Sequence, residues 1–153
     1  MGKYISKSHN KSMLLYHLVC VIKYRKGVLT ETVTNTLVNV CMEIEETSDI
    51  EFLEIGTDVN HVHFLIQTTP TYSVAQYVKL IKGRTANKIF KIHPELRNIL
   101  YGGEFWSDGY WIVTVSQHGI EDVIRKYVRE QGKDKYNLLY ERKENSDLRD
   151  DTF

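Results

Sequence analysis

Apolar and polar positions alternate with a period of two from residue 61 to residue 67, and this alternation predicts a β-strand. One face of the strand is apolar and belongs to the core: Val62, Phe64 and Ile66. The other face begins with His61 and His63, directly after the polar turn at 58–60. Two neutral imidazoles this close can hold one divalent metal ion, although such a pair is a weak signal by itself.

Periodicity along the rest of the chain predicts further strands and helices. Thr30 reads as the N-cap of one helix, and Ser73 with Gln76 forms a capping box for another. The predicted strands lie at 13–24, 50–57, 61–67 and 112–115, and the predicted helices at 30–48, 73–93 and 120–133. Up to the last strand this is the order of an α+β, ferredoxin-like βαββαβ antiparallel sheet with helices on one face. The last helix is a C-terminal addition.

The chain has 153 residues, of which 42% are hydrophobic, and this suits one compact domain with a core. We place that domain at 12–135, between a basic N-terminal arm at 1–11 and a charged C-terminal tail at 136–153. Basic and acidic residues balance, so net charge indicates neither a nucleic-acid nor a membrane partner. There is no signal peptide and no apolar run that could span a membrane, and Cys20 and Cys41 read as buried free thiols. These features predict a soluble cytoplasmic protein.

The last predicted helix carries Tyr127 and Gln131, which are one turn apart and share a face beside the apolar stripe. Such a tyrosine ordinarily packs at the edge of a core. Here Arg125 and Lys126 flank the phenol, and positive charge favours the phenolate, which can act as a covalent nucleophile. Gln131 would add an amide oxygen to the two histidine nitrogens. This incomplete, mostly hard donor set suits Mg²⁺ or Mn²⁺ better than a structural Zn²⁺.

Basic residues gather on the predicted helix at 73–93, where Gly83 stands between Lys82 and Arg84. Glycine costs a helix about 1 kcal/mol, and close approach of another backbone or of a phosphate would explain its presence. The aromatic residues at 105–111 either stack on unpaired bases or pack the end of the sheet. The sequence also leaves two roles for His17, which is either a third metal ligand or a histidine hydrogen-bonded within the sheet.

Together and in this order, these motifs resemble those of the single-tyrosine HUH transposases of small bacterial insertion sequences, where HUH denotes histidine, hydrophobe, histidine. The resemblance covers roughly residues 12–135. Its segments are Tyr16–Val19, Lys23–Arg25, His61–His63, Lys82–Arg84, Phe105–Tyr110 and Ile124–Tyr127 with Gln131. The chain departs from the family at Asn60, where members often carry an acid. This departure concerns the surroundings of the histidines, and nearby Asp58 is a further candidate ligand.

The resemblance implies an enzyme that cuts and rejoins single-stranded DNA at the ends of an insertion sequence and needs no nucleotide cofactor. Tyr127 would attack a backbone phosphorus, leaving a 5′-phosphotyrosine link and a free 3′-OH. Mg²⁺ or Mn²⁺ held by His61, His63 and Gln131 would polarise that phosphate. Family members act as homodimers on DNA hairpins, in the bacterial or archaeal cytoplasm, with the tyrosine helix placed in cis or in trans. The basic residues expected to contact DNA are Lys82, Arg84, Lys88, Arg125 and Lys126.

Three other functions fit parts of the same pattern. One is a domesticated HUH nickase that acts on chromosomal repeats. Another is a ferredoxin-like nucleic-acid-binding module without catalysis. The third is a metal-dependent hydrolase whose nucleophile is water. A metal-dependent covalent adduct with single-stranded DNA that is lost in Tyr127→Phe separates the last two from the transposase.

Overall fold

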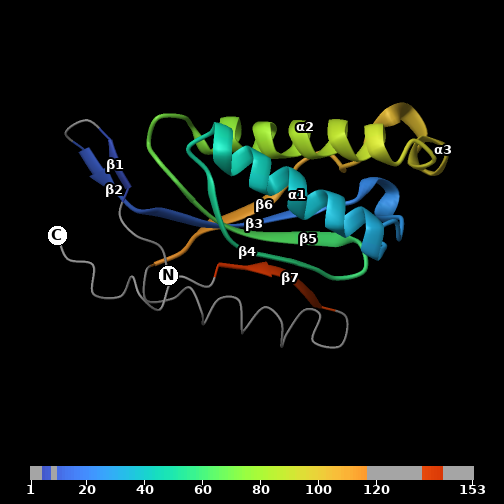
Figure 1. The fold of residues 1–153 in the computed structure, drawn as a ribbon, viewed down its shortest axis with the longest axis horizontal. Helices are drawn as coiled ribbons and strands as arrows, with labels where there is room; N and C mark the ends of the chain where they lie inside the picture. The colour runs from blue at the N-terminus through green and yellow to red at the C-terminus, as the bar shows by residue number, and fades with distance from the viewer. Residues whose placement is uncertain (1–4, 8–9, 117–135, 143–153) are drawn as a thin grey trace.

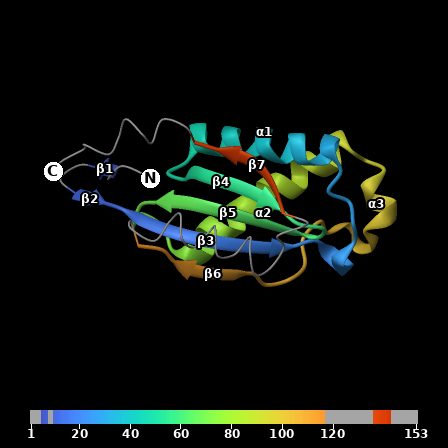
Figure 2. The ribbon, with the colours of Figure 1, turned by 90° about the horizontal axis from the view of Figure 1, so that it is seen from below.

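The chain folds around a five-stranded antiparallel sheet, and the computed structural model describes residues 5–7, 10–116 and 136–142. Figure 2 shows the strand order across the sheet, which is β6, β3, β5, β4, β7. The strands are β3 (Leu14–Val21), β4 (Glu51–Thr57), β5 (His61–Thr68), β6 (Trp111–Thr114) and β7 (Asn137–Glu141). Without β7 this is the strand order of a ferredoxin-like sheet, and the predicted fold class is confirmed.

Two long helices, α1 (Glu31–Thr47) and α2 (Val74–Ile92), cover one face of the sheet (Figure 1). Each begins where the sequence predicts. The Thr30 side chain accepts a hydrogen bond from the backbone of Val33, and Ser73 makes a complete capping box with Gln76. Short helical turns lie before α1, at η1 (Lys23–Arg25), and after α2, at α3 (Leu96–Ile99) and η2 (Tyr101–Gly103).

The alternation along β5 separates the two faces of the sheet. The apolar set under the helices, Val62, Phe64 and Ile66, belongs to the main core. A smaller apolar cluster lies on the opposite face and contains Leu15, Leu53, Leu65 and Val115. The strand register pairs Val21 with His61 and Val19 with His63. Both histidines therefore lie at the end of the sheet where β3 ends and β5 begins.

Two features differ from the sequence prediction. In the predicted arm and the first residue after it, β1 (Ile5–Lys7) and β2 (Asn10–Ser12) pair as a separate two-stranded sheet. The prediction of a charged tail is wrong for β7, which pairs with β4 as an edge strand. All five side chains of β7 are exposed or half-buried, so this strand lacks the alternation of buried apolar and exposed polar positions by which strands are detected. The predicted helix at 120–133 lies outside the described residues.

Two predictions from composition can be compared directly with the structure. Cys20 and Cys41 are both buried and free, as expected. Among the described residues, no helix has both the length and the apolar character needed to cross a membrane.

Candidate active site

The Asp58 carboxylate joins the two histidines at the β4–β5 turn. Its Oδ1 accepts a hydrogen bond from the backbone N–H of His61 at 3.0 Å and lies 3.2 Å from His61 Nδ1. Its Oδ2 lies 3.4 Å from His63 Nε2. The Asp58 backbone N–H also donates to the His61 carbonyl at 3.1 Å, which closes the hairpin. Local turn chemistry thus brings together three of the four side chains predicted as metal ligands.

Burial keeps His63 neutral. Its side chain is 1% exposed, and this loss of solvent lowers the pKa of His63 to about 4, although Asp58 acts in the opposite direction. A neutral imidazole has a free nitrogen lone pair for a metal. Two imidazoles and one carboxylate fit Mg²⁺ or Mn²⁺ as a partial donor set. Across the described ranges, no three His, Cys, Asp or Glu side chains are arranged as a metal centre, so Asp58, His61 and His63 do not form a complete one by themselves.

His17 lies next to this site on the same face of the sheet. Its ring centroid is 5.6 Å from that of His63 and 5.3 Å from that of Trp111. Burial, and to a lesser degree His63, lowers the pKa of His17 to about 4. His17 thus packs between aromatic rings and, within the described part of the chain, is not part of a metal centre with Asp58.

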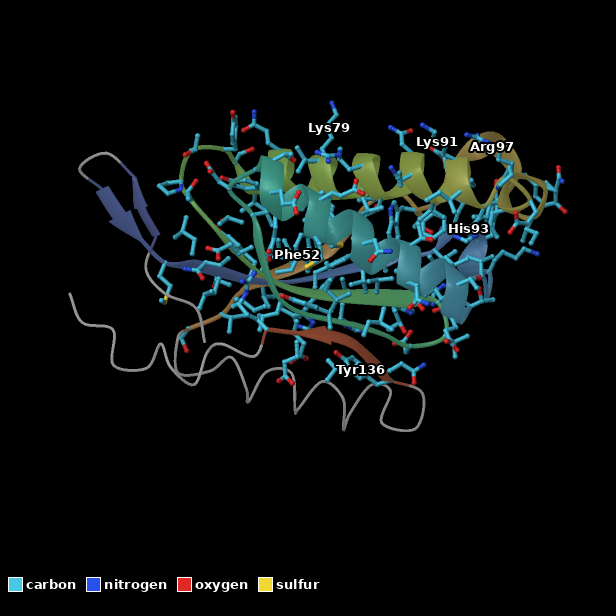
Figure 3. The ribbon with its side chains drawn as sticks, in the orientation of Figure 1. Phe52, Lys79, Lys91, His93, Arg97 and Tyr136 are labelled. Atoms are coloured by element: carbon cyan, nitrogen blue, oxygen red, sulfur yellow. The ribbon has the colours of Figure 1, made fainter. Side chains whose placement is uncertain are left out.

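Tyr136 is a site residue that the sequence analysis missed. It immediately precedes β7, and its ring centroid is 5.6 Å from that of His63. Its hydroxyl donates a hydrogen bond to Glu54 Oε2 at 3.4 Å. Figure 3 shows Tyr136 on the side of the sheet away from the helices, whereas Phe52 lies between the sheet and the helices. Among the tyrosines that the structure describes, Tyr136 is therefore the one whose hydroxyl lies beside the histidine pair.

The surroundings of Tyr136 disfavour a phenolate. Burial, followed by the carboxylates of Glu54, Asp58 and Glu141, raises the pKa of Tyr136 well above its usual value. Burial likewise raises the pKa of Glu54 to about 7. A phenol held in its neutral form is a poor nucleophile, so the position of Tyr136 indicates a packing role.

Gly56 is the sequence signal that could have revealed this contact. A Cβ at this strand position would overlap the Tyr136 phenol, so only glycine leaves room for the ring. Glycine inside a strand often marks the close approach of another group.

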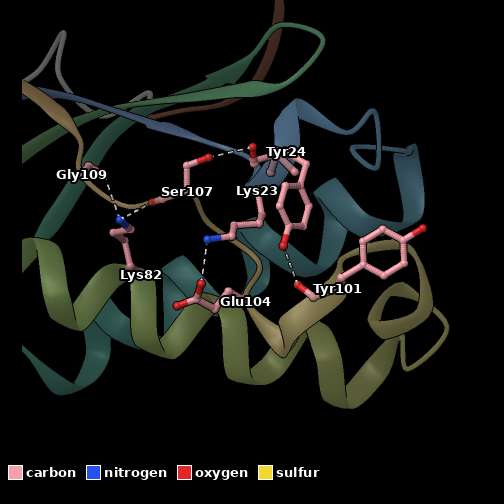
Figure 4. Close-up of polar contacts among 8 residues, drawn as sticks. Lys23, Tyr24, Lys82, Tyr101, Glu104, Ser107 and Gly109 are labelled. Atoms are coloured by element: carbon pink, nitrogen blue, oxygen red, sulfur yellow. Dashed lines mark hydrogen bonds and ion pairs between the residues drawn. The ribbon is translucent and has the colours of Figure 1, made fainter.

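The other predicted site residues fall into two sets. Those on the last predicted helix, Tyr127, Gln131, Arg125 and Lys126, lie outside the described residues. The basic residues of α2 are described, and they differ in what they contact. Lys82 Nζ donates to the carbonyl oxygens of Ser107 and Gly109, both at 2.9 Å (Figure 4). The ammonium group of Lys82 thereby joins α2 to the loop before β6.

Arg84 and Lys88 line a groove of about 310 Å³ between α1 and α2. Arg84 Nη1 donates to Thr47 Oγ1 at 3.3 Å, and Lys91 lines the same groove. Among the described residues, a Cβ at Gly83 would meet nothing within 4 Å, so the approach of another described segment does not explain that glycine.

The aromatic segment before β6 is divided between core and surface. Phe105 and Trp106 are buried, and Trp106 Nε1 donates to Thr85 Oγ1 at 2.9 Å. Tyr110 and Trp111 are 44% and 48% exposed. The sequence left open whether these aromatic residues pack the end of the sheet or stack on bases. Phe105 and Trp106 pack in the core, whereas Tyr110 and Trp111 are partly exposed to solvent.

Comparisons with known proteins agree with this architecture. The chain is 34% identical over 118 residues to the ISDra2 transposase TnpA of Deinococcus radiodurans, covering 77% of this chain and 84% of that one. It is 24% identical over 131 residues to the transposase for insertion sequence element IS200 of Salmonella typhimurium, covering 86% and 85%.

Two solved structures share the fold. A crystal structure described as a transposase from Deinococcus radiodurans superposes with a TM-score of 0.67 at 29% identity, covering 83% of this chain and 97% of that one. A REP-associated tyrosine transposase bound to a REP hairpin superposes with a TM-score of 0.55 at 8% identity, covering 81% and 72%. The profile of the family described as "Transposase IS200 like" matches residues 10–131. The chain, a DNA-processing enzyme by family, therefore belongs to the IS200-like transposases.

Proposed function

We propose that this transposase cleaves and rejoins single-stranded DNA at insertion-sequence ends through a 5′-phosphotyrosine intermediate. The observation that carries the proposal is the convergence of Asp58, His61 and His63 at one end of the sheet, in a chain of this family. Tyr127 is the proposed nucleophile. It lies on the segment that joins β6 to β7, the two edge strands of the sheet that holds the histidines.

The roles of the individual groups follow from their chemistry. His61, His63 and Asp58, with Gln131, would hold Mg²⁺ or Mn²⁺. A divalent ion bound there supplies positive charge beside the scissile phosphate. The Tyr127 oxygen forms a bond to phosphorus, the P–O3′ bond breaks, and the phenolic proton balances the charge on the 3′ oxygen. In the rejoining step a 3′-OH attacks the phosphotyrosine and Tyr127 recovers its proton.

DNA contact is proposed for the basic side of the helical layer. Arg84 and Lys88 lie along one groove with Lys91, and Figure 3 shows Lys79 and Lys91 on the outer side of α2. Such a row suits the phosphate backbone of a hairpin. The structural neighbour bound to a REP hairpin supports a DNA partner of this kind. Arg125 and Lys126 are further proposed DNA contacts. Assembly into a homodimer in the bacterial or archaeal cytoplasm is also part of the proposal.

A covalent-adduct assay tests the proposal. A labelled oligonucleotide carrying an element-end hairpin, incubated with protein and Mg²⁺, should migrate with the protein after denaturation. The adduct should disappear in Tyr127→Phe, in His63→Ala and after chelation of the metal. Tyr136→Phe is the matched control, because it removes the phenol that the structure shows beside His63. An adduct that persists in Tyr127→Phe and disappears in Tyr136→Phe would show that the nucleophile is wrongly assigned.

A further inference from the structure

A pair of exposed tyrosines lies at the end of the sheet, beyond the histidines. Tyr24 is 52% exposed and Tyr101 is 65% exposed, and their ring centroids are 6.1 Å apart. The Tyr24 hydroxyl donates to the Tyr101 carbonyl at 3.2 Å, which joins segments far apart in the sequence (Figure 4). Single exposed aromatic residues are ordinary, but two in contact on one surface need a physical reason.

The backbone holds Tyr24 in an uncommon conformation. Tyr24 and Arg25 have φ of 58° and 53°, in the left-handed region that residues other than glycine seldom adopt. On the other side, Gly102 and Gly103 also have positive φ. Strained positions of this kind persist only where the surrounding structure fixes them, and they are enriched at ligand-binding sites.

Hydrogen bonds fix the strained turn to its neighbours. The backbone N–H of Ile22 donates to the Asn60 carbonyl and that of Lys23 to the Phe105 carbonyl, both at 2.9 Å. Lys23 Nζ forms an ion pair with Glu104 at 2.8 Å and lies 5.6 Å from the centroid of the Tyr24 ring. These contacts fix the backbone around Tyr24, so the two exposed tyrosine rings keep their positions at the surface.

Several exposed cations lie on the segments that carry this tyrosine pair. Arg25 and Lys26 are exposed, and Arg97, also exposed, lies near Gly103 and over the ring of Phe90. The nearby carboxylate of Glu104 is already paired with Lys23, and Asp108 acts on the same lysine. Flat aromatic faces among cations suit a polyanion with unpaired bases, because bases stack on the rings while cations contact the phosphates.

The turn that carries Tyr24 contacts a residue next to the candidate active site. Asn60 Nδ2 donates to the Arg25 carbonyl at 3.4 Å, and Asn60 immediately precedes His61. The β3–β5 register ends at the pair Val21–His61, directly before the strained turn. A strand whose phosphate lies at the histidines can thus extend around the end of the sheet onto Tyr24.

From these observations we propose that Tyr24 and Tyr101 form a stacking surface for unpaired bases of the DNA strand that enters the active site. This inference rests on the proposed function for its substrate class, single-stranded DNA. The rings would hold bases without reading their sequence, since every base has a π face. Arg25 and Lys26 would neutralise the phosphates next to the stacked bases.

Binding measured without chemistry tests the inference. Fluorescein-labelled single-stranded DNA of mixed sequence is titrated with Tyr127→Phe protein in the presence of a chelator. Adding Tyr24→Leu or Tyr101→Leu should weaken binding about 5- to 140-fold, the range that one lost base–aromatic stack gives. Tyr24→Phe keeps the ring face and should bind as before. Arg25→Gln should instead lower the slope of log affinity against log salt.

Tyr72→Leu is the matched control for these substitutions. Tyr72 is 56% exposed and also contacts another tyrosine ring, that of Tyr77 at 5.9 Å, but it lies at the start of α2. Its replacement should leave DNA affinity unchanged. Folded Tyr24→Leu and Tyr101→Leu proteins that bind within twofold of the parent would overturn the inference. An equal loss of DNA affinity in Tyr72→Leu would also overturn it, because it would show that any exposed tyrosine ring contributes to binding.

The inference and the proposed function fail in different ways. If the leucine variants bind normally while the Tyr127-dependent adduct forms, the stacking surface is refuted and the proposed chemistry stands. If the leucine variants lose affinity and Tyr127 never forms an adduct, the surface is supported and the proposed chemistry is refuted.

Discussion

Replacing Gly56 by alanine tests the packing of Tyr136 beside the histidines. A Cβ at position 56 would lie too close to three atoms of the Tyr136 side chain, the farthest being Cε1 at 2.8 Å. The ring would have to move, and its hydrogen bond to Glu54 would be lost. Overpacking of this kind costs about 1–3 kcal/mol, so the melting temperature of Gly56→Ala should fall by roughly 2–12 °C in a chain of this size.

The sign of the effect should reverse once Tyr136 is absent. The backbone at Gly56 does not have a positive φ, so it accepts alanine. In a Tyr136→Ala background the clash is gone, and alanine should then be neutral or stabilise by about 0.4–1 kcal/mol by restricting the unfolded chain. Thermal unfolding of both single variants and the double variant measures this coupling. An equal cost of Gly56→Ala in both backgrounds would mean that Tyr136 does not lie on Gly56.

Four further outcomes follow from the described contacts. Tyr136→Phe should keep the covalent adduct, measured on a denaturing gel, because the neutral phenol is not the nucleophile. Lys82→Ala should lower the free energy of unfolding by about 1.5–3 kcal/mol in denaturant titration, since a charged donor to two carbonyls is lost. Without metal, stability should fall as pH drops from about 6.5 to about 4, because His17 and His63, with lowered pKa, take up protons only on unfolding. Replacing both histidines by glutamine should remove this loss of stability on acidification, and an unchanged loss in that variant would contradict the reasoning. Mn²⁺ should raise the melting temperature of the parent but not of His63→Ala, and an equal rise in both would place the ion elsewhere.

Several elements could be predicted because their signals are local. The alternation at 61–67 places His61 and His63 on the face away from the helices. The turn with Asp58 returns the chain within a few residues, so the carboxylate meets both imidazoles without any long-range contact. Helix caps at Thr30 and Ser73 depend on neighbours three residues along the chain. Sequence therefore sufficed to bring Asp58, His61 and His63 together and to give the order of the main elements.

Other features depend on contacts between segments far apart in sequence. β7 pairs with β4, and Tyr136 reaches His63 through that pairing. The Lys82 ammonium group could contact solvent, DNA or protein, and only the fold shows that the loop before β6 supplies its acceptors. The same holds for Tyr24 and Tyr101, whose contact follows from two separate turns.

The sequence by itself determined which residue types could hold a metal, which face of β5 carries them, and the family to which the chain belongs. The tertiary structure decided what surrounds them: Tyr136 over Gly56, Lys82 in the loop, and the exposed tyrosine pair. The physical reason is the range of the forces involved. Periodicity and capping act over a few residues along the chain, whereas packing and edge pairing join groups whose separation in sequence leaves no local trace.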